Sequence, residues 1–142
     1  MADKRTPILF LILALVQSVH SIEEYSSQLY NRFPVVTGEI HRIISIFPII
    51  HMHKTVFAAL NIVFVAFLLI VGISLFKGRP WAKRAARLIA VVEIVNGLAH
   101  LSAAVYTGGY FPGCISAAGL LIIGILLFRS TEGVKIFRRV TP

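Results

Sequence analysis

Two short polar clusters interrupt segments that are otherwise apolar. The first (QSVHSIEE) contains Gln17, His20, Glu23 and Glu24, and the second (EIVNGLAH) contains Glu93, Asn96 and His100. An acidic side chain at the centre of a membrane helix costs about 2.5–3.5 kcal/mol, whereas each Leu or Ile contributes only about 0.3–0.6 kcal/mol. Such groups are retained where they face each other, water or a bound ion, so the two clusters form the candidate functional site.

The spacing within each cluster places its members on one face of a helix. Two sets have steps of three and then four residues: Glu93, Asn96 and His100 in one, and Gln17, His20 and Glu24 in the other. Such steps return to nearly the same side of an α-helix, so each set forms a polar stripe. If both segments cross the bilayer in the same direction, the stripes lie at one depth in its outer half. They meet if the two helices are neighbours.

Imidazole and carboxylate groups together suggest metal chemistry, because they are the usual ligands of Zn, Fe and Mn. The candidate ligands are His20, Glu23, Glu24, Glu93 and His100. The candidates for holding these ligands in place are Gln17, Asn61, Asn96 and Tyr110. Glu93 and Glu24 are the candidates for direct roles in catalysis, with Glu93 either a ligand or a general base.

Two interpretations without a metal remain open. In the first, the glutamates and histidines exchange protons as an acid–base site or a proton relay. In the second, they form a buried hydrogen-bond network that only holds the helices together.

The elements that must position these residues are predicted from hydropathy. The chain has 142 residues, of which 57% are hydrophobic and 14% charged. Apolar runs near the roughly 20 residues needed to cross a bilayer recur along it. They cover residues 7–25, 54–76, 84–106 and 112–129, with an interfacial or re-entrant segment at about 39–53. The expected fold is all-α: a single transmembrane domain over residues 1–142, built as a four-helix bundle.

The distribution of basic residues predicts the orientation in the membrane. Eleven of the 14 basic residues lie on one side of the expected bundle: Lys4, Arg5, Lys77, Arg79, Lys83, Arg84, Arg87, Arg129, Lys135, Arg138 and Arg139. Only Arg32, Arg42 and Lys54 lie on the other. The positive-inside rule then places both termini in the cytoplasm of a multi-pass cell-membrane protein. The net charge of +8 therefore indicates contact with membrane lipid and not with nucleic acid.

The chain also resembles a family of uncharacterised bacterial membrane proteins named for an HXXEE motif. The resemblance is carried by VHSIEEY, NGLAH and GGYFPG, in that order along most of the chain. The positions that match are His20, Glu23, Glu24, Asn96, His100, Tyr110, Pro112 and Gly113. Phe111 stands where the family pattern has a small residue, which is expected to alter the mouth of the site. The resemblance implies metal binding or catalysis without a known substrate.

These observations predict a small membrane metalloenzyme that acts on a lipid-soluble or interfacial substrate. A proton- or metal-transport subunit and a structural membrane protein with a buried polar network are the alternatives. Transport needs polar groups along the whole depth of the bundle, whereas the inner half is almost purely apolar (ILFLILAL, LLIVGISLF). The oligomeric state is not predicted.

Overall fold

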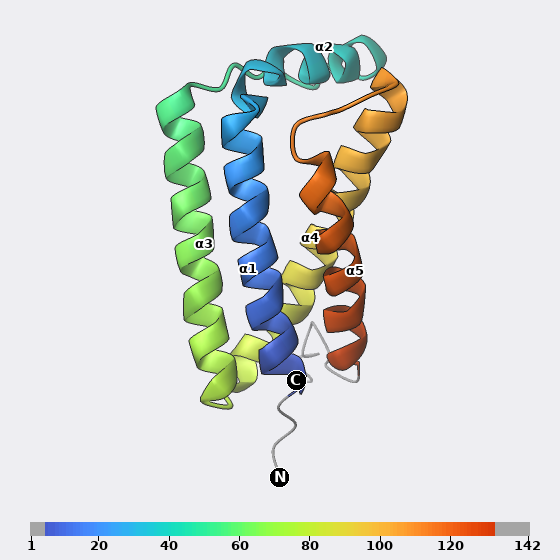
Figure 1. The fold of residues 1–142 in the computed structure, drawn as a ribbon. Helices are drawn as coiled ribbons and strands as arrows, with labels where there is room; N and C mark the ends of the chain where they lie inside the picture. Colours follow the sequence, from blue (N-terminus) through green and yellow to red (C-terminus); the bar gives the residue numbers. More distant parts are fainter. Residues whose placement is uncertain (1–4, 133–142) are drawn as a thin grey trace, which may run out of the picture.

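The computed structural model describes residues 5–132, and this part of the chain is helical without any strand. Its elements are α1 (Arg5–Ser26), a short 3-10 turn η1 (Leu29–Asn31), α2 (Phe33–Ile43), α3 (Lys54–Phe76), α4 (Pro80–Thr107) and α5 (Cys114–Ser130). Figure 1 shows α1, α3, α4 and α5 side by side, with α2 lying across one end of the bundle. The all-α prediction is confirmed. The basic residues predicted near the chain ends, Lys4, Lys135, Arg138 and Arg139, lie outside the described residues.

Three of the described helices, α1, α3 and α4, are long and apolar enough to cross a membrane. The fourth apolar helix, α5, has 17 residues. At about 1.5 Å per residue it is about 25 Å long, shorter than the roughly 30 Å hydrocarbon core of a bilayer. The structure therefore supports a membrane protein with three full-length candidate spans and one shorter helix.

The start of α5 is displaced into the bundle by the link that precedes it. Gly108 ends α4 with a φ of 66°, and Gly113 precedes α5 with a φ of 87°. These left-handed conformations favour glycine, because a Cβ would be strained there. Between them the chain descends from the end of α4 and enters α5 well below the neighbouring helix ends (Figure 1). Non-helical backbone consequently lies at the depth of the polar clusters.

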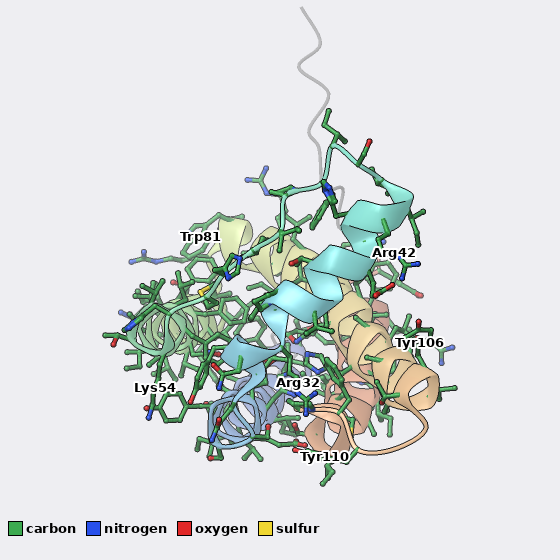
Figure 2. The ribbon with its side chains drawn as sticks, turned by 90° about the horizontal axis from the view of Figure 1, so that it is seen from above. Arg32, Arg42, Lys54, Trp81, Tyr106 and Tyr110 are labelled. Carbon is green, nitrogen blue, oxygen red and sulfur yellow. The ribbon has the colours of Figure 1, made fainter. Side chains whose placement is uncertain are left out.

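The segment over residues 39–53, predicted to be interfacial or re-entrant, is helical only in its first part. The helix is α2, Phe33–Ile43, which begins before this segment, with Pro34 in its first turn. No helix covers residues 44–53, where Pro48 lacks the N–H that a helix needs. The N–H of Ile50 instead donates to Thr37 Oγ1 at 2.9 Å, which ties this segment back across α2. Seen from above in Figure 2, α2 crosses the ends of the long helices.

The half of the bundle away from α2 is packed with large apolar side chains. Phe10, Leu13, Leu68, Leu120 and Leu127 are completely buried there. They come from α1, α3 and α5, and they pack in one cluster with small residues of α4. The polar clusters lie above this layer, on the α2 side. The described part of the bundle thus has an apolar floor beneath its polar residues.

Helices α4 and α5 approach each other closely at Gly97. A Cβ built on Gly97 would lie 2.8 Å from the carbonyl oxygen of Ala117 and 3.1 Å from the backbone nitrogen of Leu121. Small residues commonly allow such backbone contact between membrane helices. The contact fixes α4, which carries Asn96 and His100, against α5.

We therefore expect Gly97→Ala to destabilise the protein, because the groups it would strike are backbone atoms that cannot rotate away. The expected loss is about 1–3 kcal/mol, as is typical of overpacking. The measurement is the thermal unfolding midpoint of the detergent-purified protein. Gly38→Ala is the matched control, because a Cβ at Gly38 meets nothing within 4 Å. Equal midpoints for the two variants would contradict the close approach.

Candidate functional site

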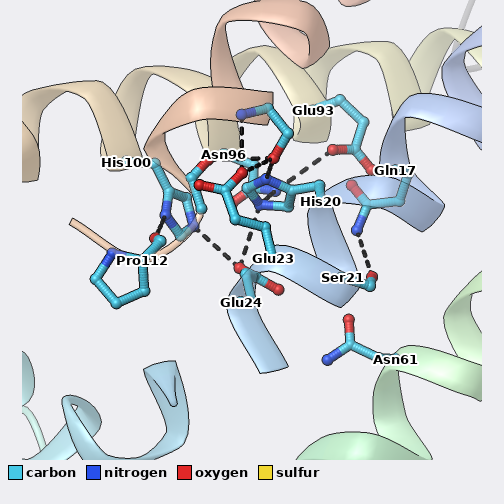
Figure 3. A network of polar contacts seen from close by, with 12 residues as sticks. Gln17, His20, Ser21, Glu23, Glu24, Asn61, Glu93, Asn96, His100 and Pro112 are labelled. Atoms are coloured by element: carbon cyan, nitrogen blue, oxygen red, sulfur yellow. Dashed lines mark hydrogen bonds and ion pairs between the residues drawn. The ribbon is translucent and has the colours of Figure 1, made fainter. Parts of the chain in front are cut away.

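The two polar stripes predicted from the sequence meet inside the bundle. Helix α1 supplies His20 and Glu24, and α4 supplies Glu93, Asn96 and His100 (Figure 3). His20 and Glu93 are completely buried, and His100 and Glu24 are 7% and 8% exposed. The apolar faces of both helices are turned outward, so the polar faces form one enclosed site.

Glu24 lies at the centre of the site, between two imidazole rings. Its Oε1 is 3.2 Å from His20 Nε2 and 3.1 Å from His100 Nε2. The rings are nearly perpendicular, with centroids 4.7 Å apart. One ligand atom from each of the three residues lies within 4.8 Å of the others. We call His20, Glu24 and His100 the histidine–glutamate cluster.

The opposite nitrogens of both rings are held by α5 and the link before it. His100 Nδ1 lies 2.6 Å from the carbonyl oxygen of Pro112, which can only accept, so Nδ1 carries the proton. His20 Nδ1 lies 2.8 Å from Ser116 Oγ. The Ser116 hydroxyl donates its proton to Glu23 at 2.5 Å, so its oxygen accepts from His20 Nδ1.

These hydrogen bonds determine what faces Glu24. A neutral imidazole that donates through Nδ1 presents a lone pair at Nε2. If both rings are neutral, two such lone pairs face one carboxylate oxygen at 3.1–3.2 Å, whereas a ring that is also protonated at Nε2 donates to Glu24 as an ion pair. Acceptors repel one another at this distance, so the neutral arrangement needs a cation between them. The cluster therefore favours positive charge, supplied by a proton on a ring or by a metal ion.

Glu23 lies outside the cluster and binds the beginning of α5. One carboxylate oxygen accepts from the N–H and hydroxyl of Ser116, at 2.9 and 2.5 Å. The other accepts from the N–H of Ile115 at 3.2 Å and the hydroxyl of Tyr110 at 3.1 Å. A carboxylate at a helix N-terminus satisfies N–H groups without partners and complements the helix dipole. Glu23 thus fixes Ser116, which in turn holds His20.

Glu93 lies beside the cluster, where Asn96 links the two. Asn96 Nδ2 is 3.4 Å from both His20 Nε2 and Glu93 Oε2. Three buried side-chain atoms of the described residues have no hydrogen-bond partner: Glu93 Oε1 and Gln17 Oε1 beside the cluster, and Arg87 Nε near the other end of the bundle. Gln17 donates to Ser21 Oγ at 3.2 Å. A buried acceptor without a partner costs stability, so the two oxygens leave the site able to accept further hydrogen bonds.

Asn61, which the sequence analysis names as a candidate for holding the ligands, makes its hydrogen bond within α3. Its side-chain amide donates to the carbonyl of Phe57, one turn earlier in α3, at 3.1 Å. Figure 3 shows Asn61 below Ser21, on the same side of α1 as the outer part of Glu24. The structure therefore places Asn61 at the edge of the site and gives it no direct bond to the cluster.

The segment between α4 and α5 can lie close to the rings of His20 and His100 because residue 113 is a glycine. A Cβ on Gly113 would lie 2.7 Å from His100 Nδ1 and 2.8 Å from His20 Cε1. The GGYFPG block drew attention to Tyr110, Pro112 and Gly113, but their contacts could not be inferred from it. Ser116 was not predicted, because a single serine in an apolar helix gives no signal of its own.

Aromatic and aliphatic side chains cover the site on the α2 side. Leu29, Tyr30 and Phe57 form a buried cluster, against which Phe33, Met52 and Phe111 pack. The ring of Phe111 lies 5.8 Å from that of His100, centroid to centroid. Phe111 therefore forms part of this cover, at the position where the sequence predicted an altered mouth.

The fold and site define a helical protein with candidate membrane spans and a buried histidine–glutamate cluster. The chain belongs to the family described as proteins of unknown function with an HXXEE motif, whose family model matches residues 11–128. Residues His20 to Glu24 form the motif itself. No curated protein and no solved structure shows a significant match to the chain.

We expect Gly113→Ala to destabilise the protein by about 1–3 kcal/mol more than Gly108→Ala, because only the first methyl group overpacks the imidazole rings. Gly108 is the matched control, since its φ of 66° imposes similar strain while its surroundings are open. The measurement is a thermal unfolding cycle in which each change is repeated in a His100→Ala protein. If contact with the His100 ring causes the larger destabilisation by Gly113→Ala, the difference between the two glycine variants should be smaller in the His100→Ala protein. A difference of the same size in both backgrounds would refute this explanation.

Proposed function

We propose that the protein is a membrane-embedded metalloenzyme in which His20, Glu24 and His100 bind a divalent ion. Its substrate is lipid-soluble or interfacial. The observation that carries the proposal is the convergence of two imidazole Nε2 atoms on one carboxylate oxygen, while both Nδ1 atoms donate elsewhere. With both rings neutral, a metal ion would supply the positive charge that this arrangement needs.

The two Glu24–histidine distances in the cluster are compatible with Zn, Fe or Mn, and all three ligand atoms lie within 4.8 Å of one another. Metal–ligand bonds of about 2.0–2.1 Å place tetrahedral ligands about 3.3 Å apart. The two distances from Glu24 to the histidines, 3.2 and 3.1 Å, are close to this value. Metal-binding histidines usually donate their other N–H to a carbonyl or a carboxylate, often through a further group. Pro112 O and the Ser116–Glu23 pair supply such partners.

The number of ligands favours catalysis over a purely structural role. Structural zinc sites are usually closed by four protein ligands, whereas catalytic sites have three and keep one position open. A bound divalent ion would activate water or polarise a carbonyl group there. Glu93 is placed to accept a proton beside the cluster, with Asn96 holding its Oε2 and its Oε1 unpartnered. We therefore assign Glu93 as the general base.

An enzyme is favoured over a transport subunit by the apolar floor of the bundle. Phe10, Leu13 and Leu120 are completely buried beneath the cluster. The buried polar residues farther down, Thr6, Ser74 and Thr131, are uncharged. An ion that leaves the cluster toward this end would therefore meet no carboxylate or imidazole in that buried layer. The site accordingly supports chemistry on one side of the bundle better than passage through it.

The metal content of Glu24→Gln and Glu93→Gln variants distinguishes a metal ligand, Glu24, from a general base, Glu93. We expect about one Zn, Fe or Mn per chain by elemental mass spectrometry of detergent-purified protein. The ion is lost in the His20→Ala, His100→Ala double variant and in Glu24→Gln, whereas Glu93→Gln keeps it. Ser116→Ala weakens binding about 10–100-fold, because it removes the acceptor that orients His20.

Glu93→Gln is the matched control, since it makes the same chemical change in an equally buried carboxylate. Loss of the ion in Glu93→Gln would make Glu93 a ligand. Absence of metal in the unsubstituted protein, even after reconstitution with each ion, would refute the metal site. It would favour the acid–base site or the structural network.

We further propose four membrane crossings, with both termini in the cytoplasm. Helix α5 serves as the fourth crossing, and the non-helical link covers the remaining depth. Support comes from Lys77, Arg79, Lys83, Arg84 and Arg87, which lie around the α3–α4 turn at the end opposite α2. Such a concentration of basic residues is typical of the cytoplasmic side.

Cysteine accessibility tests this orientation. In a Cys114→Ser protein, which has no other cysteine, we expect Arg42→Cys to react with a membrane-impermeant maleimide on intact cells. Arg79→Cys should react only after the membrane is permeabilised, because the α3–α4 turn faces the cytoplasm. The opposite pattern would reverse the topology.

A further inference from the structure

A groove of about 680 Å³ runs between α1 and α3 on the outside of the bundle. Most of its lining is apolar, including Ala66 and Leu69 of α3, and none of the lining residues is charged. Polar groups enter the lining from α1 at Ser18 and Ser21 and from α3 at Asn61. The groove is thus apolar along most of its length and polar at the level of the histidine–glutamate cluster.

We propose that this groove binds the substrate as a single-chain lipid with an uncharged, hydrogen-bonding head. The chain lies along α3 toward Leu69, and the head lies at Ser21 and Asn61, next to Glu24. A long-chain alcohol, amide or ester has this chemistry. The inference rests on the proposed enzymatic function and specifies the substrate class and its route to the site.

The dimensions of the groove suit one apolar chain. From Asn61 to Leu69 the helix rises about 12 Å, at about 1.5 Å per residue. This is somewhat less than half of the roughly 30 Å hydrocarbon core, as expected for a chain confined to one leaflet. The volume falls within the range of about 300–1,000 Å³ that is usual for small-molecule sites. Because α1 and α3 are both candidate spans, the chain enters sideways from the lipid.

The level of the groove at Ser21 and Asn61 disfavours a charged head. A phosphate or carboxylate would lose hydration there without meeting a charged lining residue, which is unfavourable. Lys54 Nζ lies 5.3 Å from the ring of Tyr25, another lining residue, but it belongs to the first turn of α3, about 10 Å along the helix from Asn61. Ser21 and Asn61 instead offer neutral hydrogen-bonding groups. Ser21 also accepts from Gln17, the buried neighbour of the site. Figure 3 shows Asn61 near Ser21. Glu24 is not among the residues that line the groove, but a tenth of its side chain is exposed.

The cover on the α2 side favours this lateral route. Leu29, Tyr30 and Phe57 are at most 9% exposed and close the bundle above the cluster. The apolar floor closes it below. A substrate that approaches along the groove reaches Ser21, which is three residues from Glu24 on α1, without disturbing either layer.

Photolabelling tests the proposal with a defined probe. The probe is a long-chain alcohol with a diazirine near its methyl end, incorporated with the full-length protein into phosphatidylcholine nanodiscs. We expect saturable labelling of Val65, Ala66 and Leu69, mapped by mass spectrometry. Unlabelled alcohol should compete, whereas an alkane or additional phosphatidylcholine should not. Ala66→Trp should lower the saturable labelling about tenfold, because the indole fills a site of this size.

Two further variants make the result specific. Val92→Trp places the same indole on an exposed position of α4 outside the groove and should leave labelling unchanged. Asn61→Leu should remove the preference for alcohol over alkane while keeping the chain site. Labelling that does not saturate, or that Ala66→Trp leaves unchanged, would show ordinary surrounding lipid and overturn the proposal.

The same labelling of the His20→Ala, His100→Ala double variant separates this inference from the proposed metal site. Persistent saturable labelling there supports the groove whatever the metal analysis shows. A metal-binding protein whose groove gives no saturable labelling would overturn the groove alone.

Discussion

Burial of a carboxylate between two imidazole rings, inside an apolar bundle, is the constraint on which the rest of this structure depends. Such groups cost least when their polar atoms have partners or compensating charges. The outward nitrogens of His20 and His100 find their partners in the Pro112 carbonyl and in Ser116. Both partners belong to the link and the first turn of α5. The late start of α5 therefore follows from the need to bring backbone and a hydroxyl group to the depth of the rings.

The residues of the HXXEE motif have two different positions: His20 and Glu24 lie inside the site, and Glu23 contacts the N-terminus of α5. His20 and Glu24 are four residues apart, so both project from α1 toward α4. Glu23 projects about 100° away around the helix, where it meets the N-terminus of α5. The adjacent glutamates thus have separate tasks. One faces the histidines, and the other anchors the helix that orients His20. This division explains why two neighbouring carboxylates are tolerated at one depth.

The sequence predicted the helices and the polar faces well, because both depend on local patterns. The predicted spans end within four residues of the observed helices α1, α3, α4 and α5. The prediction for residues 39–53 was wrong in its bounds, because the apolar character of the segment continues past the end of α2 at Ile43. The partners of the histidines could not be predicted. The Pro112 carbonyl has no side-chain signature, and the direction of Glu23 has meaning only once α5 is placed. Long-range contacts of this kind depend on tertiary packing.

The enclosure of the site limits the directions from which a molecule could reach it. Leu13 and Leu120 lie in the floor, Tyr30 and Phe57 lie in the cover, and all four are buried. Helix α5 packs against both α1 and α4, which closes a third side. Two hollows lie in the described part of the chain. The groove between α1 and α3 has no charged lining residue, whereas a pocket of about 490 Å³ beyond the end of α1 is lined by polar groups that include Gln28, Asn31 and Arg32. Under the proposed function, the groove is the route that suits a neutral molecule dissolved in the bilayer, and the polar pocket is the route that would suit a water-soluble one.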